Sequence, residues 1–326
     1  MALAPAESVM RAAARISTFV NRTRMIRSSG LSRIAGADVR LKLENEQRTG
    51  SFKVRGATNV VAMMTDDERA RGVAASSAGN HGLGVAYAAK EFGVTATIFI
   101  PRNAPRVKRE GILALGATVM DEEPNYDAAM VAAIAFARER GSRFIHPCLG
   151  DGLLAGQGTV ALEVLAESPG LRTFVVNVGG GGLLGGCAGL LRDHAPSVRI
   201  AGAQTTHTAA MAKSLAANRV VEIEDLPTLA DGLAGQVDDA ALAIGRAGLD
   251  EMVTVTEEEL GRAMLWLLDE HGLRVEGAGA AGVAAILSGR LRPIGETVVV
   301  VSGGNVDDDR IAELRARVGL AEPGRS

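Results

Sequence analysis

TFVVNVGGGGLLGG, residues 173–186, joins an apolar run to a helical run, LLGGCAGLLRDHA, through four consecutive glycines. A short apolar run that ends in glycine and is followed by helical periodicity is typical of a strand that passes into a helix. Bare backbone N–H groups converge in such a loop at the positive end of the helix dipole, where anions bind. The stretch therefore predicts a strand and helix of an α/β sheet, with an anion site between them, and phosphate is the expected anion.

Short apolar runs rich in Val, Ile and Ala alternate with helical segments of about 10–15 residues along most of the chain. This alternation predicts parallel strands with helices on both faces of the sheet. The predicted strands are too numerous for one ordinary open sheet. They are residues 39–44, 73–77, 96–100, 117–121, 144–146, 173–178, 199–203, 252–255 and 297–302. Thr256 precedes three glutamates, which predicts an N-cap at the start of a helix.

The composition is that of a globular protein with an aliphatic core. Of the 326 residues 47% are hydrophobic and only 3% aromatic, so Ala, Val, Leu and Ile supply the core. The 35 basic and 38 acidic residues are interspersed and leave a net charge of −3, which provides no basic face for nucleic acid. We interpret an early group of arginines as a solvated helix face. They are Arg11, Arg15, Arg22, Arg24 and Arg27.

Two further features bear on where the protein acts. Cys148 and Cys187 make neither a disulfide framework nor a metal-binding motif. The N-terminus has no apolar signal core with a cleavage site, and no apolar run reaches the length of about 18 residues that a membrane span needs. We therefore expect a cytoplasmic protein that does not enter a membrane.

The glycine loop also satisfies the dinucleotide pattern G-x-G-x-x-G through Gly180, Gly182 and Gly185. A dinucleotide site needs an acidic residue about 20 residues further on, at the end of the next strand, and the residue reached here is Gln204. No G-K-[ST] follows the glycines, which argues against a nucleoside-triphosphate loop. The loop fits a single compact phosphate better than either nucleotide.

Two more loops carry polar groups at expected strand ends. SSAGNHGLG, residues 76–84, offers hydroxyl, amide and open N–H groups at a helix start, which suits a carboxylate, with Asn80 available to a second, flat ligand. An N-cap and tight turn is an equal reading of this loop, and His81 in it has a structural reading as a donor. VVVVSGGN, residues 298–305, ends a buried strand in Ser302, which has a hydroxyl for a ring nitrogen; a strand-terminating turn is the common alternative reading.

Lys53 lies in NEQRTGSFKVRGA, residues 45–57, behind a Gly-Ser turn and an aromatic residue at the expected start of a helix. A lysine in water keeps its proton up to a pKa of about 10.4 and attacks carbonyls only when burial or a nearby cation lowers that value. Taken alone, Lys53 is more simply a solvated side chain. Together with a phosphate loop, a carboxylate loop and a lone serine, it indicates one ligand, pyridoxal 5'-phosphate bound as an imine to Lys53.

Five motifs in the chain resemble those of the fold type II pyridoxal-phosphate enzymes, in the threonine dehydratase and serine racemase branch. They occur in the family's order, and the likeness runs over residues 7–317, nearly the whole chain. The motifs are TGSFKVRGA, SSAGNHG, VGGGGLL, PTLADGLAG and VVVVSGGNVD. The resemblance implies an α/β fold of two open twisted sheets of mostly parallel strands covered by helices. It also implies a homodimer, a large domain of residues 1–65 and 150–326, and a small mobile domain of residues 66–149 that closes over the substrate.

The same resemblance implies a role for each residue of the site. Lys53 would be the Schiff-base lysine, Phe52 would pack on the cofactor ring, and Asn80 would bond the phenolic oxygen of the ring. Ser302 would bond the pyridine nitrogen, and Glu276 would lie near the open side of the ring. The phosphate would be held by Gly179, Gly180, Gly181, Gly182 and Leu183. The substrate carboxylate would be held by Ser77, Ala78, Asn80 and His81.

Three departures limit this resemblance. Serine racemases of this type have a serine where this chain has Ala78, so we expect racemisation to be weak or absent. The divalent-metal site of several members needs two carboxylates, and the matching positions here are Gln204 and Ala210. We therefore predict no metal site. Ala129 does not supply the arginine that some relatives direct at the substrate.

The predicted reaction is β-elimination of water from a 3-hydroxy amino acid such as threonine or serine, which yields a 2-oxo acid and ammonia. Lys53, displaced by the substrate amine, would take the Cα proton. The motifs leave open phenylserine, threo-3-hydroxyaspartate or an intermediate of hydroxyectoine breakdown as the substrate. An NAD-linked oxidoreductase, which energy transfer to nicotinamide would reveal, and a regulator that binds the cofactor without releasing ammonia are the alternatives from other classes.

Overall fold

A computed structural model describes residues 2–102 and 106–321. The chain forms two compact units, each with one sheet. Among the described residues, the first unit comprises 2–22, 47–102, 106–163 and 181–196, and the second comprises 23–46, 164–180 and 197–321. None of the described helices is both long enough and apolar enough to cross a membrane.

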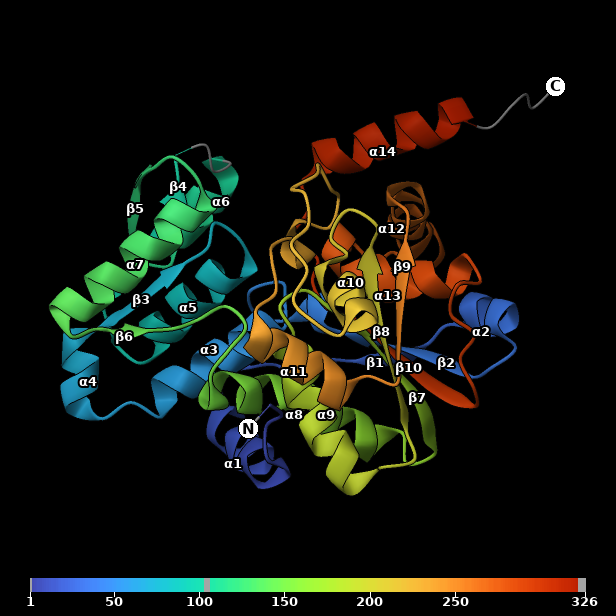
Figure 1. The fold of residues 1–326 in the computed structure, drawn as a ribbon, viewed down its shortest axis with the longest axis horizontal. Helices are drawn as coiled ribbons and strands as arrows, with labels where there is room; N and C mark the ends of the chain where they lie inside the picture. Colours follow the sequence, from blue (N-terminus) through green and yellow to red (C-terminus); the bar gives the residue numbers. More distant parts are fainter. Residues whose placement is uncertain (1, 103–105, 322–326) are drawn as a thin grey trace. The chain divides into compact units, whose positions relative to one another are not determined.

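The first unit holds β3 to β6 and the helices around them (Figure 1). Its helices are α1 (Ala6–Ile16), α3 (Lys53–Ala62), α4 (Asp66–Arg71), α5 (Asn80–Glu91), α6 (Arg106–Ala114), α7 (Tyr126–Arg140), most of α8 (Asp151–Glu167) and α9 (Gly182–His194). Its strands are β3 (Val73–Ser76), β4 (Ala96–Pro101), β5 (Thr118–Glu123) and β6 (Arg143–Phe144).

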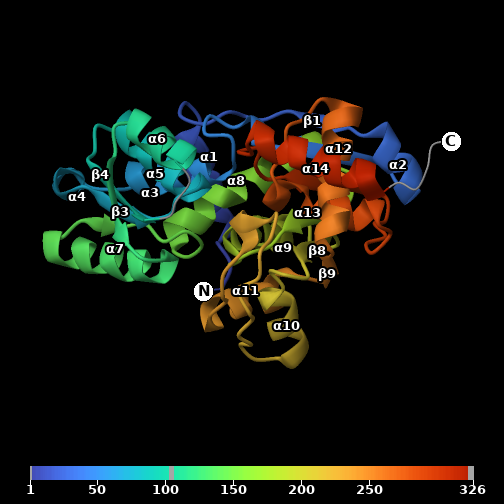
Figure 2. The ribbon, with the colours of Figure 1, turned by 90° about the horizontal axis from the view of Figure 1, so that it is seen from above.

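The sheet of the first unit is parallel, with the strand order β5-β4-β3-β6. Because β3, α5, β4, α6 and β5 follow one another in one direction across the sheet, right-handed crossovers place α5 and α6 on the same face. The return through α7 to β6 places α7 on the other face, as Figure 2 shows. α7 packs on β3 and β4, and the core between α5 and the sheet is formed by small and branched side chains such as Val85, Ala89 and Ile98.

The second unit holds the larger sheet. Its strands are β1 (Met25–Arg27), β2 (Val39–Leu43), β7 (Leu171–Asn177), β8 (Arg199–Thr205), β9 (Glu251–Val255) and β10 (Glu296–Val301). Its helices are α2 (Ser29–Ala35), α10 (Ala210–Ala217), α11 (Asp239–Gly248), α12 (Glu257–His271), α13 (Gly277–Leu287) and α14 (Asp308–Ala321), with the 3-10 turns η1 (Glu44–Glu46) and η2 (Asp231–Leu233).

The larger sheet has the strand order β1-β2-β10-β7-β8-β9, parallel except for β1. α13 packs across β7 to β10 and is buried on nearly every side. A Cβ atom on Gly282 would lie 3.0 Å from side-chain atoms of both Val175 and Val299, so the helix lies very close to the sheet. Thr256 caps α12 in a reciprocal capping box with Glu259, which confirms the predicted N-cap.

Each of the nine predicted strands overlaps a strand of the structure, and the predicted two-sheet α/β fold is confirmed. The prediction missed β1, because three residues at an antiparallel edge are too few to show periodicity. The four-stranded sheet lies within residues 66–149, the range predicted for the small domain. The boundaries and mobility of that domain stay predictions.

Candidate active site

Lys53 is the first residue of α3 and reaches the loop that follows β6. Its Nζ donates a hydrogen bond to the carbonyl oxygen of Pro147 at 2.7 Å and lies 4.0 Å from Sγ of Cys148. Phe52 precedes it, and the ring centroid of Phe52 lies 5.4 Å from the same nitrogen. The Lys53 side chain is partly buried. The amine is therefore held in one place but not sealed into the core.

A buried arginine anchors the helix that carries Lys53. Arg55 is 0% exposed, and its guanidinium donates to both carboxylate oxygens of Glu163, at 2.7 and 3.0 Å. It also donates to Thr159 Oγ1 at 3.1 Å and to the Asn21 carbonyl at 3.2 Å. Two parallel charge-assisted bonds fix both distance and direction. Arg55, two residues after Lys53, thereby ties α3 to α8.

The loop predicted to bind a carboxylate follows β3 and leads into α5. The Gly79 N–H donates to Ser77 Oγ at 3.1 Å, which closes a small turn before the helix. Ser77, Ala78 and Asn80 are all partly buried. The first N–H groups of a helix have no intrahelical acceptor, so this loop can donate hydrogen bonds to an anion.

Gly84, one turn further along α5, brings this helix against α3. A Cβ atom on Gly84 would lie 3.1 Å from the backbone nitrogen of Val54 and 3.2 Å from the carbonyl carbon of Lys53. These contacts are tighter than ordinary van der Waals contact, so a larger side chain here would force the two helices a few tenths of an ångström apart. The carboxylate loop and the lysine therefore lie on two helices in direct backbone contact.

His81 is buried, and its ring serves the fold. The side chain is 2% exposed, and Nε2–H donates to the Ile145 carbonyl at 2.8 Å, since a carbonyl can only accept. Burial, together with the nearby Lys53 ammonium, lowers the pKa of His81 to about 3. At neutral pH Nδ1 therefore carries a lone pair, and it has no hydrogen-bond partner. Because a carboxylate needs donors, His81 can contribute only its backbone N–H to substrate binding.

The glycine loop presents backbone without side chains at the start of α9. Gly181 precedes the helix with a φ of 84°, which favours glycine. A Cβ atom on Gly182 would lie 3.0 Å from the carbonyl oxygen of Cys148, and one on Gly179 would lie 3.1 Å from Cα of Leu233. The first N–H groups of α9 are at the positive end of a helix of 13 residues, so they suit a phosphate.

Pro147 and Cys148 connect two of these parts within the first unit. The Pro147 carbonyl accepts the Lys53 amine, and the backbone of the next residue, Cys148, contacts Gly182 at the start of α9. The lysine amine and the start of α9 therefore both lie next to this two-residue segment.

Ser302 and Glu276 lie in the second unit. Ser302 directly follows β10, is 4% exposed, and has its Oγ 3.1 Å from Nδ2 of Asn177 and 3.3 Å from the Ala278 carbonyl oxygen. Glu276 is the N-cap of α13 and is 6% exposed, and its backbone N–H donates to the Gly303 carbonyl at 3.2 Å. Both residues thus lie at the start of α13, where β10 ends.

The predicted site residues fall into two groups. The first unit holds Phe52, Lys53, Ser77, Ala78, Asn80, His81, Gly181, Gly182 and Leu183. The second unit holds Gly179, Gly180, Glu276 and Ser302. Sequence reasoning missed two supporting residues: Arg55, which ties α3 to α8, and Asn177, which contacts Ser302. A polar residue at the end of an apolar strand was a signal for Asn177, whereas nothing in the sequence showed that Arg55 is buried.

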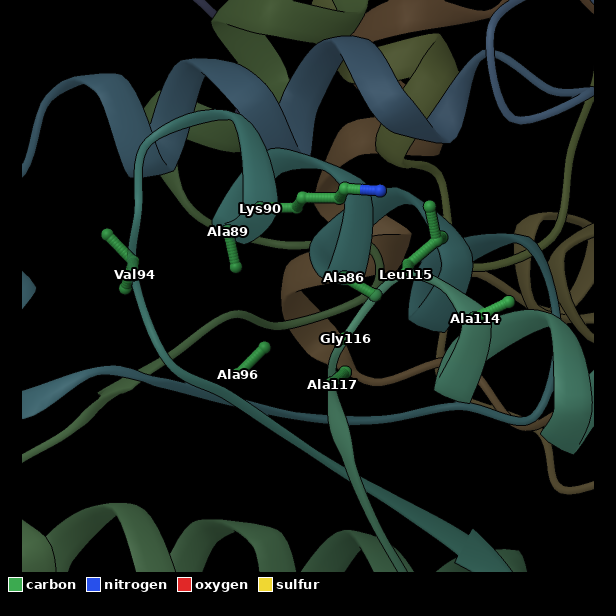
Figure 3. A pocket seen from close by; sticks show the side chains of 9 residues that line it. All are labelled: Ala86, Ala89, Lys90, Val94, Ala96, Ala114, Leu115, Gly116 and Ala117. Atoms are coloured by element: carbon green, nitrogen blue, oxygen red, sulfur yellow. The ribbon is translucent and has the colours of Figure 1, made fainter.

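A pocket of about 270 Å³ lies elsewhere in the first unit. Figure 3 shows the lining residues, which are Ala86, Ala89, Lys90, Val94, Ala96, Ala114, Leu115, Gly116 and Ala117. The pocket contains no predicted site residue and lies where β4 and β5 begin. Ligands in open α/β sheets bind beyond the opposite, carboxyl ends of the strands, so this pocket is not the active site.

The positions that match the metal site of some relatives are buried and lack carboxylates. Gln204 is 1% exposed, and its Oε1 accepts the N–H of Ala212 at 3.0 Å near the start of α10. Ala210 is also 1% exposed. In residues 2–102 and 106–321 no cluster of three His, Cys, Asp or Glu side chains could hold a metal ion. The absence of a metal site stays a prediction.

The residues present fit pyridoxal phosphate. The glycine loop leaves no space for side chains at Gly179 and Gly182, which suits a cup of backbone donors for one phosphate. The Lys53 amine can bond an aldehyde, and the Ser302 hydroxyl can bond a ring nitrogen. An α/β fold with such a lysine and such a glycine loop is typical of one class of enzymes, those that hold a phosphate-bearing aldehyde on a lysine.

Comparison with known proteins gives the family. The chain belongs to the family described as pyridoxal-phosphate dependent enzyme, whose model matches residues 16–303. It is 42% identical to an L-threonine ammonia-lyase of Thermotoga maritima over 321 residues, which cover 98% of this chain and 80% of that protein.

Two solved structures are also similar. The maize serine racemase has a TM-score of 0.91 and 32% identity, and the match covers 98% of each chain. Threonine deaminase isoform 2 from Solanum lycopersicum has a TM-score of 0.90 and 28% identity, with 97% of this chain and 88% of that chain covered.

Proposed function

We propose that this protein is a pyridoxal-phosphate-dependent ammonia-lyase that eliminates water from an L-threonine- or L-serine-type 3-hydroxy amino acid to give a 2-oxo acid and ammonia. The observation that carries the proposal is the Lys53 amine, held 2.7 Å from the Pro147 carbonyl beside the glycine start of α9. The name of the Thermotoga maritima relative supports the choice of threonine chemistry.

Different residues have different roles in the proposed reaction. When bound, pyridoxal phosphate supplies an aldehyde that joins amines and a ring that delocalises the charge left at Cα. Lys53 would hold the cofactor through its amine and, when that amine is free, would be the base that takes the Cα proton. The Pro147 carbonyl accepts a hydrogen bond from this amine and so keeps it near one position. Phe52 packs on the ring from the neighbouring position of the chain.

Backbone donors bind the anions. Gly179, Gly180, Gly181, Gly182 and Leu183 bind the phosphate. Ser77, Ala78, Asn80 and His81 bind the substrate carboxylate, with Asn80 also bonding the phenolic oxygen of the ring. Since the His81 ring donates to Ile145, the N–H groups at the start of α5 are the main donors to the carboxylate.

Ser302 and Glu276 act on the ring. The neutral hydroxyl of Ser302 would bond the pyridine nitrogen. With this hydroxyl the ring would be a weaker electron sink than with an aspartate at the same position. This suits elimination over transamination. Glu276 lies near the open side of the ring.

The test is to incubate the purified holoprotein with a panel of 3-hydroxy amino acids and to measure release of 2-oxo acid and ammonia. The panel includes L-threonine, L-serine, phenylserine, threo-3-hydroxyaspartate and hydroxyectoine-pathway intermediates. Lys53→Ala is the matched control and should abolish release. Borohydride reduction followed by peptide mapping should label Lys53. A label on another residue, or a cofactor-loaded protein that releases ammonia from no member of the panel, would contradict the proposal.

We also propose that the protein acts as a homodimer in the cytoplasm and that residues 66–149 move as a small domain against a large domain of residues 1–65 and 150–326. Neither Cys148 nor Cys187 is in a disulfide, as expected for a reducing compartment. Light scattering after gel filtration tests the dimer. Hydrogen exchange with and without substrate tests whether protection changes within residues 66–149.

A further inference from the structure

Asn177, the last residue of β7, makes four hydrogen bonds in the core of the second unit. The two hydrogens of its Nδ2 serve three acceptors, the carbonyl oxygens of Gly279 at 3.0 Å and Val300 at 3.2 Å and Ser302 Oγ at 3.1 Å, so one hydrogen is shared between two of them. Its Oδ1 accepts the Gly282 N–H at 2.8 Å. The side chain therefore ties β7 to β10 and to α13, and it is only 5% exposed.

The orientation of this amide is determined by its neighbours. Gly282 presents a backbone N–H, which requires an acceptor, and Gly279 and Val300 present carbonyls, which require a donor. Exchanging the oxygen and nitrogen of Asn177 would turn all three contacts into repulsions. The atom that faces Ser302 is therefore the amide nitrogen, which can only donate.

This contact restricts what the Ser302 hydroxyl can do. Its oxygen accepts from Asn177, so its own proton must go to another group. In the structure that group is the Ala278 carbonyl, at the long distance of 3.3 Å. An N–H donated to a hydroxyl oxygen also strengthens the hydroxyl as a donor, because bonds in a chain polarise one another. Ser302 is thus prepared to donate to an acceptor atom of a ligand.

We propose that Asn177 is a positioning residue that holds Ser302 as a hydrogen-bond donor to an unprotonated ring nitrogen of the cofactor. The proposal rests on the role of Ser302 in the proposed function. A protonated ring nitrogen would have to use the second lone pair of the Ser302 oxygen, and the Ser302 proton would then stay on the Ala278 carbonyl instead of reaching the ring. Without Asn177, the carbonyls of Gly279 and Val300 lose their donor and can take the Ser302 proton, which turns the hydroxyl oxygen towards the ring as an acceptor.

The test uses holoprotein loaded with pyridoxal phosphate labelled with ¹⁵N in the ring, whose chemical shift reports protonation of that nitrogen. The set comprises wild type, Asn177→Ala, Ser302→Ala and the double variant. We expect an unprotonated ring nitrogen in wild type and a shift towards the protonated form in Asn177→Ala. Cofactor binding should be about threefold to tenfold weaker in Asn177→Ala than in wild type, the effect of one lost hydrogen bond. Both effects should disappear when Asn177→Ala is made in the Ser302→Ala background.

Thr173→Ala is the matched control. Thr173 lies on the same strand, is 0% exposed, and exchanges two hydrogen bonds with the backbone of Ile294, at 2.9 and 3.0 Å. It should lose stability but keep the ¹⁵N signal of wild type. Asn177→Asp is the second variant if Asn177→Ala does not fold. Its carboxylate accepts the Ser302 proton, so its ring nitrogen should be protonated more readily than in wild type.

Three results separate the possible failures. A protonated ring nitrogen in wild type at neutral pH overturns the proposal without any variant. An unchanged ¹⁵N signal in Asn177→Ala or Asn177→Asp, alongside a changed one in Ser302→Ala, shows that Asn177 is merely structural and leaves the proposed function standing. Failure of borohydride to label Lys53 refutes the proposed function itself.

Discussion

Replacing His81 with glutamine should flatten the dependence of stability on pH below neutrality. His81 is buried, and burial together with the Lys53 ammonium lowers its pKa to about 3 in the folded protein, whereas an unfolded histidine titrates at about 6.5. Below about pH 6.5 the unfolded chain therefore binds one proton more than the folded protein at this residue. The free energy of unfolding must fall as the pH falls through this window.

The magnitude follows from the two pKa values. Between about pH 7.5 and pH 5.0 the titration of His81 should remove about 2 kcal/mol from the free energy of unfolding. Any folded-state pKa below about 4 gives nearly the same figure, because the folded side chain then stays neutral throughout. Glutamine keeps an N–H for the Ile145 carbonyl but does not titrate, so His81→Gln should lack this component.

The assay is urea unfolding of wild type and His81→Gln at both pH values, at equal ionic strength and with excess pyridoxal phosphate. The quantity compared is the loss of unfolding free energy between the two pH values, which should be about 2 kcal/mol larger for wild type. Equal losses in the two proteins would refute the reasoning, since His81 would then bind its proton as readily when folded. An NMR titration of the His81 ring in the folded protein checks the same point directly.

Three other perturbations test the site. Arg55→Met should cost about 3–5 kcal/mol of stability in urea unfolding, because it leaves the Glu163 carboxylate without its buried partner, and the double variant Arg55→Met with Glu163→Leu should recover much of that loss. Gly182→Ala places a Cβ atom 3.0 Å from the Cys148 carbonyl oxygen and should weaken cofactor binding by about 1–3 kcal/mol, measured by fluorescence titration; binding equal to wild type would show that the loop has slack. Ala78→Ser restores the hydroxyl of the racemases, so chiral chromatography should detect more D-serine from L-serine than wild type forms, and no gain would show that the loop hydroxyl alone is insufficient.

Local patterns predicted the fold because most of the parallel strands contain a short apolar run. The run 297–302 and its neighbours show this clearly, and their ends differ from the structure by only one or two residues. β1 follows no such rule. Its residues Met25–Arg27 pair with β2 only because the chain returns along that edge, and this information lies in the tertiary structure rather than in the three residues.

The geometry of the glycine loop was predictable where the backbone conformation demands a particular residue type. Gly181 adopts a left-handed φ, and Gly182 has backbone against it, so glycine is needed at both positions. Partners between distant segments were not predictable. The bond from Lys53 to Pro147 and the pairing of Arg55 with Glu163 depend on which loops meet in space.

The close approach of Gly84 to the backbone of Lys53 has a consequence for engineering substrate range. If the loop before α5 binds the substrate carboxylate and Lys53 takes the Cα proton, this packing fixes the distance between the two groups. Substitutions that change this distance in order to broaden the substrate range should therefore impair proton transfer for every substrate. Residues that face only the outer end of the β-substituent are the better targets for redesign.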